Sequence, residues 1–193
     1  MQQDPIVLIL MYFLLPLWLA AGFADWLCHR ASRIEITTGA KESIIHLLMF
    51  LEVGVPLIAA IFLEVNALII AVMCLAFLLH EATAIWDVSY AVTGRNVSPL
   101  EQHVHSFLEM IPLMGLLLIV PRHWPQFLSL FGIGDELARF DLAWKREALP
   151  TLYVVAFFAI ILLFELLPYL EELARGLVAN GGNLVPNATK NRR

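Results

Sequence analysis

The stretch SPLEQHVHSFLEMIPLMGLLLIV (98–120) begins with ionisable side chains and ends as an apolar run. Ser98, Pro99 and Glu101 have the spacing of a capping box with proline in the first turn, so a helix is expected to begin here. From Phe107 onward most residues are apolar, as in a helix that crosses lipid. The stretch therefore predicts a membrane-spanning helix that carries histidine and glutamate at one end.

The composition of the whole chain is that of an integral membrane protein. Of its 193 residues, 60% are hydrophobic and 15% are charged, and its mean hydropathy is +0.78, whereas a soluble domain has about 25% charged residues. A net charge of −5 argues against nucleic acid as a partner. Cys28 and Cys74 are the only cysteines, which excludes a C-x-x-C motif.

Five apolar runs approach the roughly 20 residues that a transmembrane helix needs. They are 6–24, 43–63, 66–86, 104–120 and 151–170. Only Glu64 and Val65 separate the second run from the third, so these two spans are expected to form an antiparallel hairpin. The predicted fold is an all-α, polytopic helical bundle that forms one domain over residues 1–175. The polar segment 176–193 is expected to be a disordered tail.

The segment 122–147, between the fourth and fifth spans, interleaves aromatic and aliphatic residues with charged ones. This pattern predicts an interfacial amphipathic helix anchored by tryptophan. A plain connecting loop with a packed apolar face is the alternative.

The distribution of basic residues predicts the orientation of the chain. With the N-terminus outside, eight lysines and arginines lie in cytoplasmic segments and four lie outside, which favours a cytoplasmic C-terminus. The cytoplasmic set is Arg30, Arg33, Lys41, Arg95, Arg175, Lys190, Arg192 and Arg193. We expect the protein in the inner (plasma) membrane of a bacterium, with its N-terminus outside and the histidine-rich side facing the cytoplasm.

Five of the six histidines are predicted to lie at one side of the membrane, the cytoplasmic side in this orientation. They are His29, His46, His80, His103 and His105, and each falls at the appropriate end of its span. His123 alone lies at the other side.

Carboxylates accompany these histidines at spacings of four or seven residues, which place side chains on one face of a helix. The sets are Asp25–His29, Glu42–His46, His80–Asp87 and Glu101–His105–Glu109. Glu52 and Glu81 lie at a similar depth. Four spans are thus expected to present histidine and carboxylate at one level.

Several of these residues also have a purely structural interpretation. Glu101 completes the capping box, and Glu42 lies in the first turns of a helix, where an acid interacts favourably with the helix dipole. Asp87 is expected to pair with Arg95 if no metal binds. His103 points to a different face from its neighbour His105.

A bound metal would explain why so many acids enter an apolar region. One charge in the hydrocarbon costs about 2.5–3.5 kcal/mol even on a lenient scale, and a multivalent cation neutralises acids while it binds imidazoles. Histidine with carboxylate suits iron, zinc or manganese. The candidate ligands are too many for one ion, so two ions are predicted. The candidate metal ligands are His46, His80, His105, Glu109, Glu52, Asp25, His29, Glu42, Asp87, Glu101 and His103.

The site type resembles two known kinds of di-iron centre. Four-helix di-iron proteins use inward carboxylates and histidines, although they have E-x-x-H where this chain has E-x-x-x-H. The gathering of histidines at one membrane face is similar to that of membrane desaturases and hydroxylases. This chain has no H-x-x-H-H cluster, and no residue roles are carried over from those enzymes.

The leading functional hypothesis is a membrane metalloenzyme, with about two iron ions, that hydroxylates or desaturates a lipid or other apolar substrate. Glu81 and Glu109 are its candidate catalytic acids, and an electron-donor protein is an expected partner. One alternative is a zinc-dependent intramembrane hydrolase, in which a carboxylate acts as general base. The other is a non-enzymatic subunit that binds a metal or haem.

Overall fold

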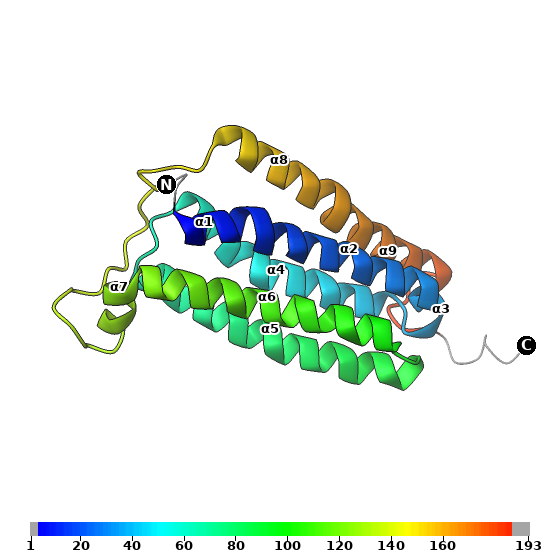
Figure 1. Cartoon of the computed structure of the whole chain (residues 1–193). Coiled ribbons are helices and arrows are strands. Elements are labelled where there is room, and N and C mark those ends of the chain that lie inside the picture. Colours follow the sequence, from blue (N-terminus) through cyan, green and yellow to red (C-terminus); the bar gives the residue numbers. More distant parts are fainter. Residues whose placement is uncertain (1–3, 187–193) are drawn as a thin grey trace, which may run out of the picture.

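The computed structural model describes residues 4–186 and is built from helices, five of which are long and apolar enough to cross a membrane (Figure 1). In chain order the elements are α1 (Pro5–Ile9), η1 (Leu10–Leu14), α2 (Leu15–Ser32), α3 (Ile34–Thr37), α4 (Ala40–Phe62), α5 (Ala67–Gly94), α6 (Pro99–Arg122), α7 (Trp124–Ser129), α8 (Thr151–Ile161), η2 (Leu162–Leu166) and α9 (Leu167–Ala179). The predicted all-α fold with five span-like helices is confirmed. Lys190, Arg192 and Arg193, which were counted for orientation, lie outside the described residues.

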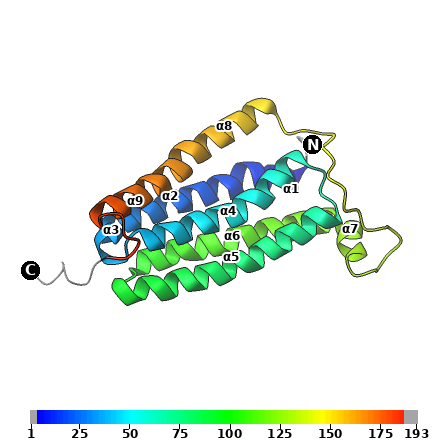
Figure 2. The ribbon, with the colours of Figure 1, turned by 180° about the vertical axis from the view of Figure 1, so that it is seen from behind.

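The long helices run side by side, and α8 diverges from the rest of the bundle (Figures 1 and 2). One end of the bundle carries α7 and the loop that follows it. At the other end lie α3 and α9, together with the end of α2 and the beginning of α4. Up–down alternation therefore gathers the ionisable ends of the spans, as the sequence predicts.

The connection between α4 and α5 is a tight hairpin, as predicted. Asn66 is the N-cap of α5, and its Oδ1 accepts a hydrogen bond of 3.2 Å from the backbone N–H of Ile69. Its Nδ2 donates to the carbonyl oxygen of Asp141 at 2.8 Å. The cap thus joins the hairpin to the loop that precedes α8.

The capping box at the start of α6 is confirmed. The Glu101 N–H donates to Ser98 Oγ at 3.1 Å, and the Ser98 N–H donates to Glu101 Oε2 at 3.4 Å. The sequence signal for the start of this helix was sufficient because both partners lie within one turn.

The segment between α6 and α8 contains only the six-residue helix α7, so the predicted interfacial helix is not confirmed. Gly132 and Gly134 have φ of +67° and +93° and interrupt helical backbone geometry after α7. The chain then crosses the α4–α5 hairpin, where Glu64 N donates to Ala143 O at 2.9 Å and Lys145 N to Phe62 O at 2.8 Å. It is a folded cap over one end of the bundle.

Two spans contain a π-helical segment, and in each the second residue after that segment is a proline in the next helix. Pro16 follows η1, and Pro168 follows η2. A proline ring cannot donate an N–H and collides with the carbonyl four residues earlier, which lies inside the π segment in both spans. The wider turn of η2 carries the buried Glu165 towards α2, where Gly22 leaves room for it.

The last helix is longer than the predicted span and runs through part of the expected tail. It ends at Ala179, and beyond it the carbonyl oxygen of Leu184 accepts a hydrogen bond of 2.9 Å from the N–H of Lys41. Gly176 allows α9 to approach α4, because a Cβ there would lie 3.0 Å from backbone atoms of Ala40. Residues 187–193 of the predicted tail lie outside the described residues.

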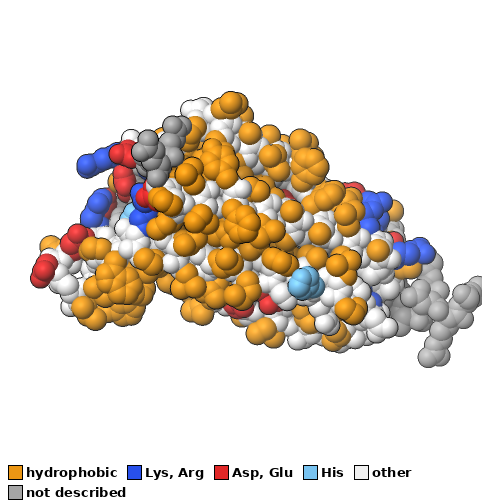
Figure 3. Space-filling view, in the orientation of Figure 1, with side chains coloured by type: hydrophobic (Ala, Val, Ile, Leu, Met, Phe, Trp, Pro, Cys, Tyr) orange, Lys and Arg blue, Asp and Glu red, His pale blue; other side chains and the backbone are white. Residues whose placement is uncertain are grey.

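Hydrophobic side chains cover the middle of the face shown in Figure 3, and charged side chains lie mainly towards its two ends. Exposed hydrophobic residues of the bundle include Leu51 on α4 and Leu75 and Leu78 on α5, with 58%, 59% and 63% of their surface accessible. A contiguous apolar band is the surface expected of a helical bundle surrounded by lipid.

The close approach of α9 to α4 predicts a large difference between two glycine substitutions. Gly176→Leu should lower the free energy of unfolding by at least about 1–3 kcal/mol, because the added side chain meets the backbone of α4. Gly54→Leu, where nothing lies within 4 Å of an added Cβ, should be neutral or slightly stabilising. Thermal unfolding in detergent, followed by circular dichroism, measures both, and equal melting temperatures would contradict the packing described.

Candidate metal centre

A cluster of buried ionisable side chains lies where the end of α2, the beginnings of α4 and α6, the second half of α5, and α9 come together. Its members share low exposure, between 0% and 9% of the residue surface. They are Asp25, His29, Glu42, His46, Asp87, Glu101, His105 and Glu172. We call these eight residues the polar cluster.

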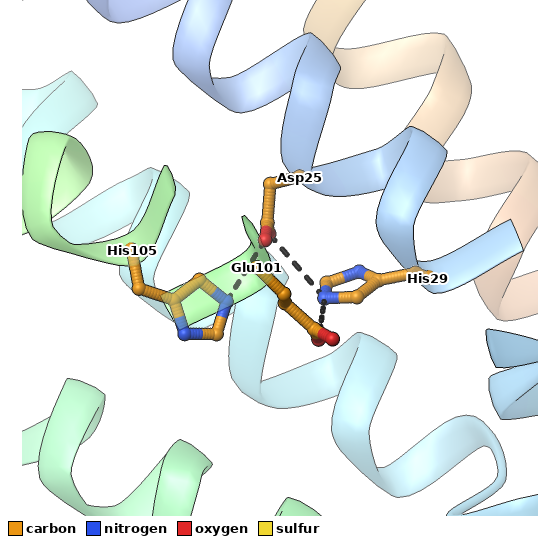
Figure 4. Close-up of side chains that lie close together, drawn as sticks. All are labelled: Asp25, His29, Glu101 and His105. Carbon is orange, nitrogen blue, oxygen red and sulfur yellow. Dashed lines mark ion pairs between the residues drawn. The ribbon is translucent and has the colours of Figure 1, made fainter. Parts of the chain in front are cut away.

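Asp25 stands at the centre of one half of the polar cluster, between two imidazoles (Figure 4). Its Oδ1 lies 2.8 Å from His105 Nε2, and its Oδ2 lies 3.4 Å from His29 Nε2. Glu101 Oε1 is 3.5 Å from the same His29 nitrogen. Residues from α2 and α6 thus place two carboxylates and two imidazoles around a common point.

The other half of the polar cluster is built around His46 on α4. Its Nε2 lies 3.1 Å from Asp87 Oδ1 on α5. Its ring stacks on that of His29, with ring centroids 4.3 Å apart and an interplanar angle of 9°. The stacking holds the two imidazoles parallel and joins the two halves of the cluster.

Glu172 on α9 accepts a hydrogen bond from each of these stacked rings. His29 Nδ1 donates to Oε2 at 3.1 Å, and His46 Nδ1 donates to Oε1 at 3.2 Å. A carboxylate on Nδ1 fixes the proton there, so that the neutral ring presents an unprotonated Nε2 on its other side. Both Nε2 atoms therefore face the acids of the cluster as potential donors to a metal.

The distances within the cluster fit metal coordination. Ligand atoms that lie about 2.0–2.2 Å from one ion are themselves roughly 2.8–3.5 Å apart, which is the range between these Nε2 and carboxylate oxygen atoms. Two sets of three or more donors lie within 4.8 Å of one another, Asp25–His29–Glu101–His105 and His29–Glu42–His46.

Several of the same atoms also lack a hydrogen-bond partner among the described residues. They are Asp25 Oδ1, His29 Nε2, His46 Nε2 and Asp87 Oδ1, all of them buried. Buried polar atoms are rarely left without a partner, because each costs about 1–3 kcal/mol. These nitrogen and oxygen atoms lie close together but are not aligned for hydrogen bonds. A cation bound between them would give each atom a partner.

Arg95, just beyond the end of α5, supplies the cation that contacts this cluster from outside the spans. Its Nη2 lies 2.5 Å from Glu42 Oε1 and 2.5 Å from Glu101 Oε1. These two carboxylates raise the pKa of the guanidinium against the opposing effect of its burial. The expected pairing of Arg95 with Asp87 is wrong, because α6 begins near the end of α5 and brings Glu101 to the arginine instead.

The formal charges of the cluster leave an excess of negative charge. Its five carboxylates are Asp25, Glu42, Asp87, Glu101 and Glu172, and Arg95 offsets one of them. With neutral histidines the remaining charge is −4, which two divalent cations would balance. Repulsion among these carboxylates at low dielectric would oppose folding without such compensation.

The remaining predicted site residues lie outside the polar cluster. His80 is buried, and its Nδ1 lies 3.9 Å from Glu52 Oε2. Neither ring nitrogen of His80 has a hydrogen-bond partner within residues 4–186, whereas Glu52 accepts a hydrogen bond from Thr83 at 2.8 Å. Glu81 is half-buried, beside His80 on α5.

Glu109 lines a pocket next to the polar cluster, whereas His103 lines neither the pocket nor the cluster. The pocket has a volume of about 60 Å3, and its walls also include His46, Asp87, His105 and Glu165. His103 is exposed on α6, and its ring packs edge-on against Phe107. Side chains from both halves of the polar cluster therefore border an internal space.

Glu172 was not among the site residues predicted from the sequence, because the fifth span was expected to end before it. Glu165 and Glu172 are seven residues apart, and their shared helical face was the signal that could have identified Glu172. Tyr169, between them, is also buried and donates a hydrogen bond of 3.2 Å to the carbonyl oxygen of Gly22. The last span therefore forms one wall of the centre.

Replacement of Glu172 should weaken metal binding more than its small change in shape suggests. In Glu172→Gln one histidine must face an amide N–H2, which favours the tautomer with a protonated Nε2, and metal affinity should fall about 10–100-fold. The adjacent Glu171→Gln is the matched control, because Glu171 is exposed and pairs with Arg30 and Arg175. Competition with a chromophoric chelator measures both, and equal affinities would rule out the proposed tautomer control.

Loss of Arg95 should destabilise the fold strongly. Arg95→Met leaves Glu42 and Glu101 buried beside each other, at a cost of about 3–5 kcal/mol. Arg30→Met removes an exposed ion pair and should cost at most about 1 kcal/mol. Thermal unfolding of the two purified variants in detergent provides the comparison, and a similar loss in both would contradict the assigned role.

Comparisons with known proteins do not place the chain in a family: no protein-family model, curated protein or solved structure matches it. The structure nevertheless supports a coarse conclusion. The chain is an apolar helical bundle of the kind that inserts in membranes, with a buried histidine–carboxylate cluster that could hold a metal ion.

Proposed function

We propose that the protein is a membrane-embedded metalloenzyme that uses iron to oxidise a lipid or another apolar substrate. The observation that carries this proposal is Glu172, which holds the Nδ1 atoms of both His29 and His46 and turns their Nε2 atoms towards buried carboxylates. The same carboxylate–histidine arrangement is typical of metal sites.

The donor set favours iron, with about two ions per chain as in other helical carboxylate–histidine centres. Imidazole and carboxylate ligands without thiolates suit iron, and a residual charge of −4 is compensated by two divalent ions. Asp25, His29, His46, Asp87 and His105 would hold them. Glu101 and Glu42 would contribute the oxygens that Arg95 leaves free.

Bound iron would supply the activation of dioxygen. A hydroxylation would consume one O2, two electrons and two protons; one oxygen atom enters a C–H bond as a hydroxyl group, and the other leaves as water. The electrons would come from a separate reduced electron-donor protein. With the polar cluster on the cytoplasmic side, as the basic residues indicate, this donor would approach from the cytoplasm.

The residues around the centre suit such a reaction. Part of the wall of the pocket beside the polar cluster is apolar and includes Met49, Phe50 and Leu108, which can exclude water from the centre. Glu109 lines the same pocket and is half-buried, so its carboxyl group can hold a proton between the exterior and the pocket. Glu81, the other acid expected to be catalytic, is not among the residues that line this pocket.

The two alternatives account for fewer of these observations. A zinc hydrolase needs three protein ligands and a water molecule, which leaves several buried acids without a role. A haem between two axial histidines would require separated rings, whereas His29 and His46 stack at 4.3 Å. The geometry thus favours a centre that uses many carboxylates.

The metal content of the purified protein tests this proposal directly. Protein produced with ample iron and zinc should contain about two irons per chain by elemental mass spectrometry. His105→Ala should lose metal, because its Nε2 lies 2.8 Å from Asp25 Oδ1. His103→Ala should retain it, because this residue is exposed two positions away on the same helix.

The possible outcomes are distinct. Iron lost in His105→Ala and retained in His103→Ala supports an iron centre at the polar cluster, and Mössbauer spectra then show whether the ions are coupled. One zinc per chain would replace the oxidase with the hydrolase. A folded protein without any metal would overturn the proposal.

A further inference from the structure

A second, larger cavity occupies the opposite half of the bundle from the polar cluster. Its volume is about 440 Å3, within the range of about 300–1,000 Å3 that is usual for small-molecule sites. It is bounded by the first span, α4, α5 and α6, and most of its walls are apolar. Lining residues that the following paragraphs use are Trp18, Glu52, Gly115, Arg122 and Lys145.

The cavity is long in the direction of the helices. On α6 its lining residues run from Ile111 to Arg122, which corresponds to about 17 Å along the helix axis. On the first span they run from Val7 to Trp18, about 17 Å. An apolar space of this length, parallel to helices that would cross a bilayer, fits one hydrocarbon chain.

The inner end of this cavity meets the pocket beside the polar cluster. Trp18 lines both spaces. Glu52 lines the large cavity and lies 3.9 Å from His80, which lines the small pocket. A chain that fills the large cavity therefore ends next to the candidate metal centre.

The outer end of the cavity is lined by ionisable residues, among which Lys145 is distinctive. Its Nζ donates one hydrogen bond of 2.6 Å, to the carbonyl oxygen of Ala60, although an ammonium has three donors. Among residues 4–186 no carboxylate lies within ion-pair distance of it. Burial lowers the pKa of Lys145, and the nearby Arg122 lowers it further against the influence of Glu64.

Two other charged residues at the outer end have partners of their own. Arg122 forms an ion pair with Asp4, and Glu64 accepts a hydrogen bond of 2.8 Å from the backbone N–H of Arg146. The pKa of His123 is lowered by burial and by Arg122 and Lys145, which favours its neutral form. Lys145 therefore has no counter-ion among residues 4–186, and an anion at the mouth would supply one.

We propose that this cavity binds a single-chain fatty acid, with the carboxylate at Lys145 and the methyl end towards Trp18. The hydrocarbon tail fills the space between the first span, α4 and α6. The head group and the polar cluster then lie at opposite ends of the bundle. The binding site stands on the cavity and on Lys145, whereas its use as a substrate site rests on the proposed function and would direct oxidation to the distal part of the chain.

A pair of glycine variants tests whether the cavity is occupied. An added Cβ at Gly115 or at Gly54 has nothing within 4 Å, but only Gly115 lines the cavity. Gly115→Leu should therefore weaken the binding of radiolabelled palmitate to protein in nanodiscs by about tenfold or more, because the side chain fills the space of the tail. Gly54→Leu should bind palmitate like the unmodified protein.

A second pair of variants tests recognition of the head group. Lys145→Met should weaken palmitate binding about tenfold, the loss expected for one charge-assisted hydrogen bond, and should leave the binding of hexadecanol unchanged. Lys41→Met serves as the control, because Lys41 lies at the other end of α4 and packs over Tyr90. Equal binding of acid and alcohol, unaffected by Lys145→Met, would mean that the cavity holds any hydrocarbon chain and would overturn the head-group assignment.

Fluorescence quenching tests the orientation of the chain. Stearate with a nitroxide near its methyl end should quench tryptophan emission, and Trp18→Phe should remove much of that quenching. Stearate with the nitroxide near the carboxylate should be much less affected by this substitution. The reverse pattern would overturn the proposed direction of the chain.

Metal content measured in the same samples separates the two proposals. Gly115→Leu should retain its metal, because Gly115 does not line the pocket beside the polar cluster. Palmitate binding by a protein that contains no metal would overturn the proposed oxidase activity and support the fatty-acid site. Metal without palmitate binding would overturn the fatty-acid site and leave the oxidase intact.

Discussion

The bundle depends on compensation of buried negative charge. Each carboxylate that leaves water for a medium of low dielectric loses several kcal/mol of solvation, and five of them meet at one end of this bundle. Arg95 compensates part of that charge by contacting Glu42 and Glu101 together. The imidazoles, placed between the remaining acids, provide the rest of the contacts and the nitrogen donors for a cation.

Glu172 orients the two stacked imidazoles of the polar cluster. By binding the Nδ1 atoms of His29 and His46, it turns one edge of the stacked pair outward to α9 and the other inward to Asp25 and Asp87. The last span is therefore an integral part of the centre. Its close contact with α4 at Gly176, one turn beyond Glu172, keeps the carboxylate within reach of both rings.

The interior of the protein is divided along its axis. Ionisable residues surround a small pocket at one end, and an apolar cavity extends from there to the capped end. Trp18 belongs to both spaces and marks the boundary. A division of this kind would separate the place where an amphiphile is recognised from the place where its chain reacts. The folded loop after α7 holds Lys145 at the capped end.

The sequence by itself determined the five spans, the α4–α5 hairpin and the start of α6, because apolar length and helix caps are local signals. It also predicted that histidines and acids would share one end, since alternation of the spans follows from their number. Only the tertiary structure decided that Arg95 binds Glu42 and Glu101, that His80 and His103 stand apart from the cluster, and that Glu172 orients two rings. These outcomes depend on helix rotation and on contacts between residues up to 143 positions apart, which no spacing within one helix specifies.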